Sequence, residues 1–203
     1  MRNKGDNIIR EQVDEIGRPT IDMLYGEIAR MERNEAYRKL AFSFLKIIIT
    51  AAAIITLITN FWLAVLQIDG SSMNPTLQMD EIVLAVRTDN SVKNDIIVFT
   101  NNNKTYVKRV IAVSGDLVEI NHEGIVSVNG EVLDESYVTE KSLGTCDIEF
   151  PFIVPTGTVF VLGDNRAASV DSRDSKFSTV NREQIIGKVV FSIWPPSEIG
   201  SVS

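Results

Sequence analysis

A serine in a constrained stretch of backbone is the first residue of this chain that could do chemistry. Ser72 stands in the stretch GSSMNPTL, directly after Ser71. Pro75 fixes its own φ angle and pushes Asn74 out of the helical region, which predicts an extended or turned segment here. Such a backbone can hold one hydroxyl still, as a serine nucleophile requires.

A catalytic serine also needs a base, and the sequence offers few. The only histidine, His122, stands in INHEGIV, which is typical of a surface turn between two strands, so a Ser-His-Asp triad is not expected. Lys108 lies in KTYVKRVIAVSGD, where strand alternation places Tyr106 on its face and Arg109 on the other. Burial beside Tyr106 would lower the pKa of the amine toward a value useful for a base. The alternative is a surface lysine that lays its stem along the strand.

A third polar segment, GDNRAASVDSRD, occupies residues 163–174 and follows the strand-like run TVFVL. Taken alone it is compatible with an Asx turn that carries solvated charges, and it lacks the spacing of a calcium-binding loop. It also offers the hydroxyl of Ser169 to hold a lysine amine, and Asp171 with Arg173 as a charge pair that could hold the loop.

One long apolar stretch precedes these residues and is expected to anchor the chain in a membrane. Residues 47–68 contain no charged side chain, and as a helix they would extend about 33 Å, close to the thickness of the hydrocarbon core of a bilayer. We therefore expect one transmembrane helix, with a buried helix of a soluble core as the alternative. The stretch begins too deep in the chain for a secretory signal, and no A-x-A site closes it, so the anchor is expected to stay attached.

Basic residues around this stretch predict its orientation. The 20 residues after it contain Arg87 as their single basic side chain, whereas the 20 before it contain five: Arg30, Arg33, Arg38, Lys39 and Lys46. The positive-inside rule then places the N-terminus in the cytoplasm and residues 69–203 outside it. The charged segment 1–46 is expected to be partly helical after the break at residues 17–19, with an apolar stripe from Ile21 to Met31.

The remaining chain, residues 69–203, has the pattern of an antiparallel β-fold. Short β-branched runs alternate with Gly, Asn, Asp and Pro, and the pair Asn129-Gly130 favours a two-residue hairpin turn. The loop 139–155 shows no clear pattern. A net charge of -7 argues against nucleic-acid binding, and a single cysteine, Cys146, excludes an internal disulfide and a Cys-based zinc site.

Together and in order, SSMNPTL, YVKRVIAVSGD and GDNRAASVDSRD behind a membrane span resemble the motifs of bacterial type I signal peptidases, which are membrane-anchored Ser/Lys proteases. The resemblance extends from residue 68 to about residue 202, because NGEVLDESYV, IIGKV and WPPSEIG also stand where that family has similar stretches. It implies a mainly β, barrel-like catalytic domain at the surface of the bacterial cell membrane, behind a single N-terminal transmembrane helix.

The resemblance also implies roles for particular residues. Exported precursors would be cut after small residues at the first and third positions before the scissile bond, with no metal or cofactor. The matching positions are the nucleophile Ser72, the general base Lys108, the lysine-orienting hydroxyl of Ser169, the structural ion pair of Asp171 with Arg173, and the apolar neighbours Met73 and Tyr106. A precursor would lie extended between residues 69–71 and 106–108 and add a strand there.

The chain departs from the family pattern in two places. Gly70 stands where some relatives have a serine that helps the oxyanion hole, so the hole is expected to rest mainly on backbone N–H groups, including that of Ser72. Ala112 and Ser114 stand where many relatives have Gly and Pro. Two other functions are compatible with these motifs: a catalytically silent membrane-anchored scaffold and a self-cleaving Ser/Lys regulator.

Such regulators are typically soluble and fused to a DNA-binding module, whereas this chain has an expected membrane span and a net charge of -7.

Overall fold

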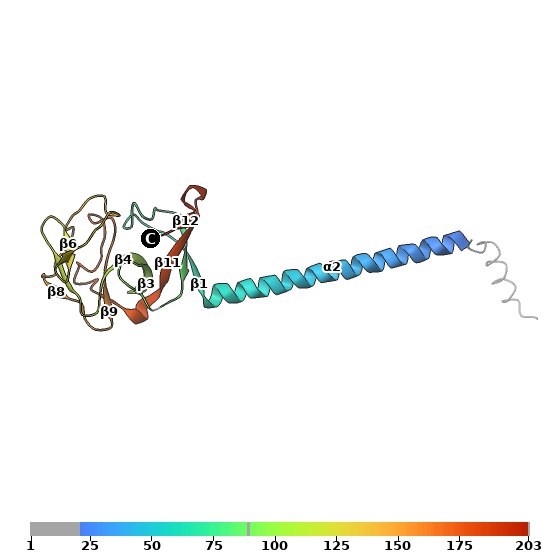
Figure 1. Ribbon diagram of the computed structural model, residues 1–203, viewed down its shortest axis with the longest axis horizontal. Coiled ribbons are helices and arrows are strands. Elements are labelled where there is room, and N and C mark those ends of the chain that lie inside the picture. Colours follow the sequence, from blue (N-terminus) through green and yellow to red (C-terminus); the bar gives the residue numbers. More distant parts are fainter. Residues whose placement is uncertain (1–20, 89, 203) are drawn as a thin grey trace, which may run out of the picture. The chain divides into compact units, whose positions relative to one another are not determined.

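The computed structural model describes residues 21–88 and 90–202, which divide into two compact units at the boundary between Thr56 and Leu57 (Figure 1). The expected break at residues 17–19 lies outside the described residues.

A single long helix, α2 (Ile21–Phe61), forms most of the first unit and extends into the start of the second. It is the one described helix that is long and apolar enough to cross a membrane, and none of its most apolar stretch is buried inside the protein. Exposure of so many apolar side chains favours a membrane helix over the alternative from sequence, a helix buried in a soluble core.

The predicted helix over residues 47–68 is too long at its C-terminal end. Helix α2 ends at Phe61, and strand β1 (Leu63–Gln67) follows and pairs antiparallel with β2 (Ile82–Val86). An uncharged run of Leu, Val and Ile suits a buried strand as well as a membrane helix, so composition could not place this boundary. Pairing with β2 decides it, because β1 satisfies the backbone groups of one of its edges in the sheet.

Antiparallel strands form all of the sheet structure described in the second unit, as the sequence predicted. One sheet follows the order β1-β2-β11-β3-β4-β9-β10, with β12 also paired to β11, and a smaller sheet follows the order β7-β6-β5-β8. The remaining bounds are β3 (Ile96–Asn101), β4 (Lys104–Val113), β5 (Leu117–Ile120), β6 (Val126–Val128), β7 (Glu131–Val132), β8 (Phe152–Ile153), β9 (Thr158–Leu162), β10 (Val180–Asn181), β11 (Ile185–Trp194) and β12 (Gly200–Ser201), with short 3-10 helices at Arg182–Gln184 and Pro196–Glu198.

The predicted hairpin turn is confirmed, and strand β4 is the element that matters most for the site. Asn129 and Gly130 both have positive φ angles, 55° and 82°, between the paired strands β6 and β7. Along β4, Val110 packs in one hydrophobic cluster, while Ile111 and Ala112 pack in another that reaches the smaller sheet. Packing on both faces fixes β4 in place and therefore positions its polar residues.

Candidate active site

The segment that carries Ser72 is a turn, as predicted, and it is tied down at several points. Met73 and Leu77 are buried, and Leu77 N donates a hydrogen bond to Met73 O at 2.9 Å. Asn165 reaches the turn from elsewhere in the chain. Its backbone N donates to Ser72 O at 3.1 Å and its Nδ2 donates to Ser71 O at 3.2 Å. The hydroxyl of Ser72 is therefore presented from an immobilised backbone.

Lys108 on β4 lies against this hydroxyl. Its Nζ donates a hydrogen bond to Ser72 Oγ at 2.6 Å, although the two residues are 36 positions apart in the chain. The side chain is buried and forms no ion pair with any residue that the structure describes. The pKa of Lys108 is lowered to about 8. Burial is the largest cause; the carboxylates of Asp171 and Asp164 act to raise this pKa, and the charge of Arg173 acts to lower it.

A groove of about 290 Å³ opens beside these two residues. Residues 66–70 form one wall, residues 105–108 form the other, and Ser72 and Met73 also line it. Neither wall is fully paired on this side. Within the described strands β1 pairs only with β2, and the pairing of β4 with β9 begins at Arg109. The groove therefore offers free strand edges to an extended peptide.

Gly70, the departure from the family pattern, is required by its backbone conformation. Its φ is +111°, in a region that residues other than glycine rarely adopt. An added Cβ would meet no atom within 4 Å, so the backbone angle and not a lack of space accounts for the glycine. The N–H of the nearby Ser72 donates to no group that the structure describes, so it remains available for a ligand. This agrees with an oxyanion hole built from the backbone.

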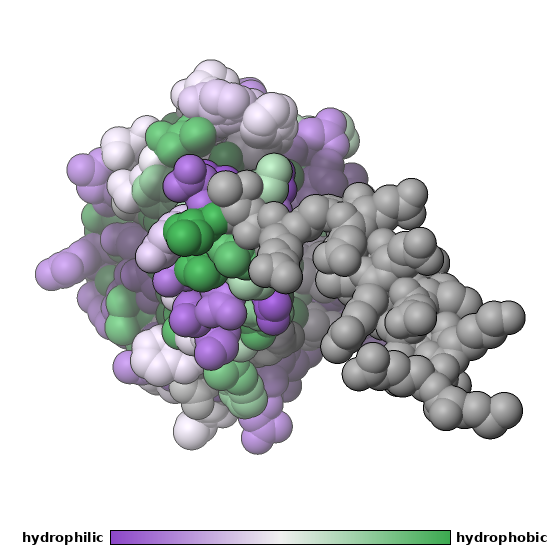
Figure 2. All heavy atoms as spheres, turned by 90° about the vertical axis from the view of Figure 1, so that its right-hand side faces the viewer, coloured by the Kyte–Doolittle hydropathy of each residue, from purple (hydrophilic) through white to green (hydrophobic). Residues whose placement is uncertain are grey.

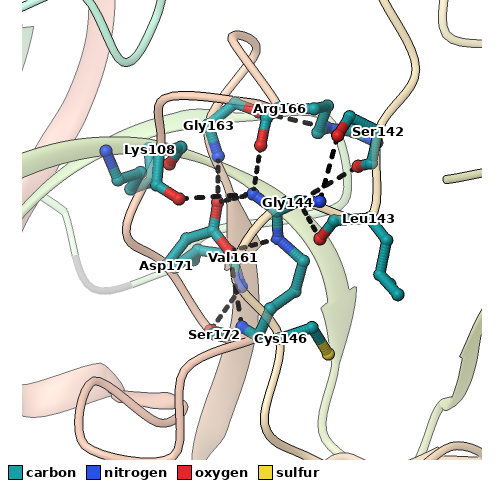
Figure 3. Close-up of polar contacts among 12 residues, drawn as sticks. Lys108, Ser142, Leu143, Gly144, Cys146, Val161, Gly163, Arg166, Asp171 and Ser172 are labelled. Atoms are coloured by element: carbon teal, nitrogen blue, oxygen red, sulfur yellow. Dashed lines mark hydrogen bonds and ion pairs between the residues drawn. The ribbon is translucent and has the colours of Figure 1, made fainter.

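The ion pair of Asp171 and Arg173 lies inside the polar loop 163–174 (Figure 3). Arg173 Nε donates to Asp171 Oδ1 at 2.8 Å, and both side chains are buried. Asp171 Oδ2 accepts from the N–H of Gly163 at 3.0 Å, while Arg173 Nη1 donates to the carbonyl of Leu143 at 2.7 Å. The pair thus connects the end of β9, the polar loop and the 139–155 segment.

Ser169 is brought to the site but does not bond to Lys108 in this structure. Its hydroxyl is buried and has no hydrogen-bond partner among the described residues. A Cβ added to Gly163 would collide with Ser169 Oγ and with the carbonyl oxygen of Ser72, so this hydroxyl lies close to the backbone of the Ser72 turn. A buried hydroxyl without a partner is costly and calls for an explanation in terms of function.

Sequence reasoning missed a second buried ion pair in this region. Arg109 donates to both carboxylate oxygens of Asp164, from Nε at 3.0 Å and from Nη2 at 2.8 Å. Its guanidinium carbon lies 3.9 Å from the ring centroid of Tyr137, and Thr76 Oγ1 donates to Asp164 Oδ2 at 2.5 Å. The pair therefore joins β4, the Ser72 turn and the polar loop. The one signal of this pair in the sequence was the position of Arg109 on the strand face opposite Lys108.

Sequence reasoning also missed a third buried arginine, Arg166, because its partner lies far away in the chain. It donates to both carboxylate oxygens of Glu135, 31 residues away. No local pattern relates these two positions. The expectation for His122 is confirmed, since it lies exposed in a turn after β5, and Cys146 is a free, half-buried thiol.

A serine hydroxyl that contacts the amine of a buried lysine without a countercharge has the geometry of a nucleophile beside its base. Residues 41–194 match the family model described as signal peptidase, peptidase S26, and the chain belongs to this family of serine endopeptidases. It is 36% identical to signal peptidase IB of Staphylococcus aureus over 74% of this chain and 88% of that protein. Signal peptidase I S of Bacillus subtilis is 32% identical over 82% of this chain and 96% of that protein.

Among solved structures, a signal peptidase I from Enterococcus faecalis V583 is similar to this chain. It is 30% identical with a TM-score of 0.41, over 49% of this chain and 96% of that chain.

Proposed function

We propose that Ser72 is the nucleophile and Lys108 the general base with which this signal peptidase removes signal peptides from exported precursors. The observation that carries the proposal is the 2.6 Å contact between Ser72 Oγ and the amine of a lysine that is buried and unpaired within the described chain. An amine in this position can take the proton of the hydroxyl as it attacks the scissile carbonyl. It can then return that proton to the leaving amine.

The lowered pKa makes the lysine an efficient base. With a pKa of about 8, roughly one Lys108 amine in ten is neutral at pH 7, against a few in ten thousand for a free lysine. In the neutral form the contact runs in the reverse direction, and the hydroxyl of Ser72 donates to Nζ. A water molecule would then release the acyl group from Ser72, with Lys108 as its base.

The groove is the binding site that we assign to the precursor. An extended chain between residues 66–70 and residues 105–108 would pair with both walls and carry its scissile carbonyl to Ser72. The oxyanion that forms there would accept from the free N–H of Ser72. Met73 and Tyr106 line the groove, and we assign them to the walls of the shallow pockets that would receive the small side chains of the family's cleavage rule.

The remaining assigned residues would support this chemistry without contacting the precursor. Ser169 has a buried, unpartnered hydroxyl beside the nucleophile turn, and we assign it the orientation of the Lys108 amine in the loaded enzyme. Asp171 and Arg173 hold the loop that carries Ser169. None of these steps calls for a metal or a cofactor.

We further propose that helix α2 crosses the bacterial cell membrane once, with the N-terminus in the cytoplasm. The part of it after Lys46, residues 47–61, would extend only about 22 Å, so we extend the span to include the uncharged, mostly apolar residues 40–45. Lys46 then lies near the cytoplasmic end, where its long side chain can reach the interface. The basic residues from Arg30 to Lys46 and the lack of any in residues 62–81 support this orientation.

We also propose that the β domain contacts lipid, and its exposed apolar surface supports this. Val65, Leu84 and Phe191 form one cross-strand row over β1, β2 and β11, and Val65 and Phe191 are exposed. Ile193 and Trp194 extend the exposed apolar surface along β11. Figure 2 shows hydrophobic residues of the described chain, in green, among hydrophilic ones at the surface. A patch of this kind suits the surface of a bilayer and not a nucleic acid.

The test uses the full chain in detergent with a precursor peptide that carries A-x-A before the cut. Ser72→Ala and Lys108→Ala should each abolish cleavage while circular dichroism shows a folded domain, because both belong to one catalytic unit. Ser71→Ala is the matched control and should remain active. Cleavage by Ser72→Ala, or its loss in Ser71→Ala alone, would overturn the assignment. A wild-type protein that binds the peptide without cutting it would identify a silent scaffold.

A further inference from the structure

A second cleft lies beside the turn at residues 72–76. It encloses about 210 Å³, and its described lining shares no residue with the groove: Asn74, Pro75, Thr139, Glu140, Asp164 and Asn165. Ser72 and Met73 of the turn line the groove, whereas the next two residues, Asn74 and Pro75, line this cleft. The turn at residues 72–76 therefore separates two binding spaces.

Two of the lining residues are directly connected to the nucleophile turn. Asn165 donates hydrogen bonds to the carbonyls of both Ser71 and Ser72, and the N–H of Asn74 donates to Ser71 O at 3.2 Å. A peptide in extended form advances about 3.3 Å per residue. If its scissile carbonyl is at Ser72, the first two or three residues after the cut are within reach of the cleft.

The cleft carries one uncommitted charge. Both oxygens of Asp164 accept from Arg109, and Oδ2 also accepts from Thr76, so this carboxylate is already satisfied. Glu140 is exposed and forms no ion pair or hydrogen bond with any described residue. No lining residue is basic, so nothing on the cleft wall neutralises the Glu140 carboxylate.

We propose that this cleft receives the first residues of the released chain, and that Glu140 gives it a preference for a lysine or arginine side chain there. The proposal rests on the proposed function, because Ser72 fixes where the cut occurs. The amide side chains of Asn74 and Asn165 would hold the peptide backbone, and the carboxylate of Glu140 would pair with the cation.

The experiment compares two precursor peptides that share one A-x-A segment and differ only in having Lys or Gln at the second residue after the cut. The full chain in detergent should cleave the Lys peptide with a kcat/KM about two- to fivefold higher, the range expected for an exposed ion pair. Added salt should reduce the ratio, because it screens such a pair. In Glu140→Lys the ratio should fall below one, since the cleft then repels the cation.

The matched control is Glu149→Lys, an exposed carboxylate in the same 139–155 segment that does not line the cleft. Its ratio should equal that of the wild type. A wild-type ratio of one, or a preference for Lys that survives in Glu140→Lys, would overturn the proposal. Failure of the proposed function gives a different result, because the Gln peptide would then remain uncut by the wild type or would still be cut by Ser72→Ala.

Discussion

Two neighbouring residues of β4 are buried to nearly the same degree but have different kinds of partner. Lys108 is 3% exposed and Arg109 is 2% exposed, and they point to opposite faces of the strand. Arg109 meets a carboxylate with two parallel hydrogen bonds and the face of an aromatic ring. Lys108 meets one serine hydroxyl.

The difference shows that burial alone does not determine what a buried cation does. The guanidinium stays charged in proteins, so Arg109 requires the permanent countercharge of Asp164 and serves to hold β4 to the polar loop. An amine can lose its proton, so a site that buries Lys108 without a close carboxylate favours the neutral form. One side of β4 holds the strand to the polar loop, and the other carries the residue that we propose as the general base.

The largest effect is expected from Lys108→Met, which keeps the length and burial of the side chain and removes the amine. Cleavage of an A-x-A precursor should fall by at least about a thousandfold, because the general base is lost. The free energy of unfolding should stay the same or rise, since no countercharge is left alone and an unpaired buried cation is removed. Peptide cleavage and thermal unfolding of the full chain in detergent measure the two effects. A large loss of stability would contradict the comparison.

The next largest effect should follow Asp164→Asn on the opposite face. This change leaves the buried charge of Arg109 without its partner, and it should lower the free energy of unfolding by about 3–5 kcal/mol. Thermal or denaturant unfolding in detergent measures it.

The matched control for this prediction is a partly exposed pair of the same domain, Lys93 with Asp116 at 3.0 Å. Lys93→Met should cost less than about 1 kcal/mol, because solvent screens that pair. Equal costs at the two pairs would show that burial does not set the value of the Arg109 contact.

Much of this arrangement was predictable from sequence because it is encoded locally. The short β-branched runs predicted as strands correspond to strands of the structure, and the Asn129-Gly130 turn follows from the two residues themselves. Ser72 and Lys108 could be singled out because one has a fixed turn and the other a strand position on an apolar face. Their contact across 36 residues was implied only by the family resemblance.

The missed features depend on partners that lie far away in the chain. Arg109 and Asp164 are 55 residues apart, and Arg166 and Glu135 are 31 apart, so no periodic pattern connects them. Strand β1 was read as part of the membrane helix because its residues are apolar, and only its pairing with β2 distinguishes the two. Composition gives the propensity of a segment, whereas the tertiary partner decides its state.

A smaller, directional effect concerns the pKa of the base. Activity should rise with pH through an apparent pKa near 8, because protonated Lys108 cannot accept the Ser72 proton. The charge of Asp171 raises this pKa and that of Arg173 lowers it, so Asp171→Asn should move the rising limb to lower pH. The pH profile of kcat/KM measures the shift independently of any loss in maximal rate. A limb that moves to higher pH would contradict the assigned electrostatics.

The smallest effect is expected from His122→Ala, and its value is that it tests the identity of the base. His122 lies exposed in the turn after β5, forms no hydrogen bond or ion pair with any described residue, and is absent from the lining of the groove. Removing its imidazole should leave both the maximal rate and the rising limb of the pH profile within error of the wild type, because proton transfer to Lys108 does not pass through it. If the limb instead disappeared in His122→Ala and persisted in Lys108→Met, a histidine would be the base. The unpaired burial of Lys108 would then have no catalytic meaning.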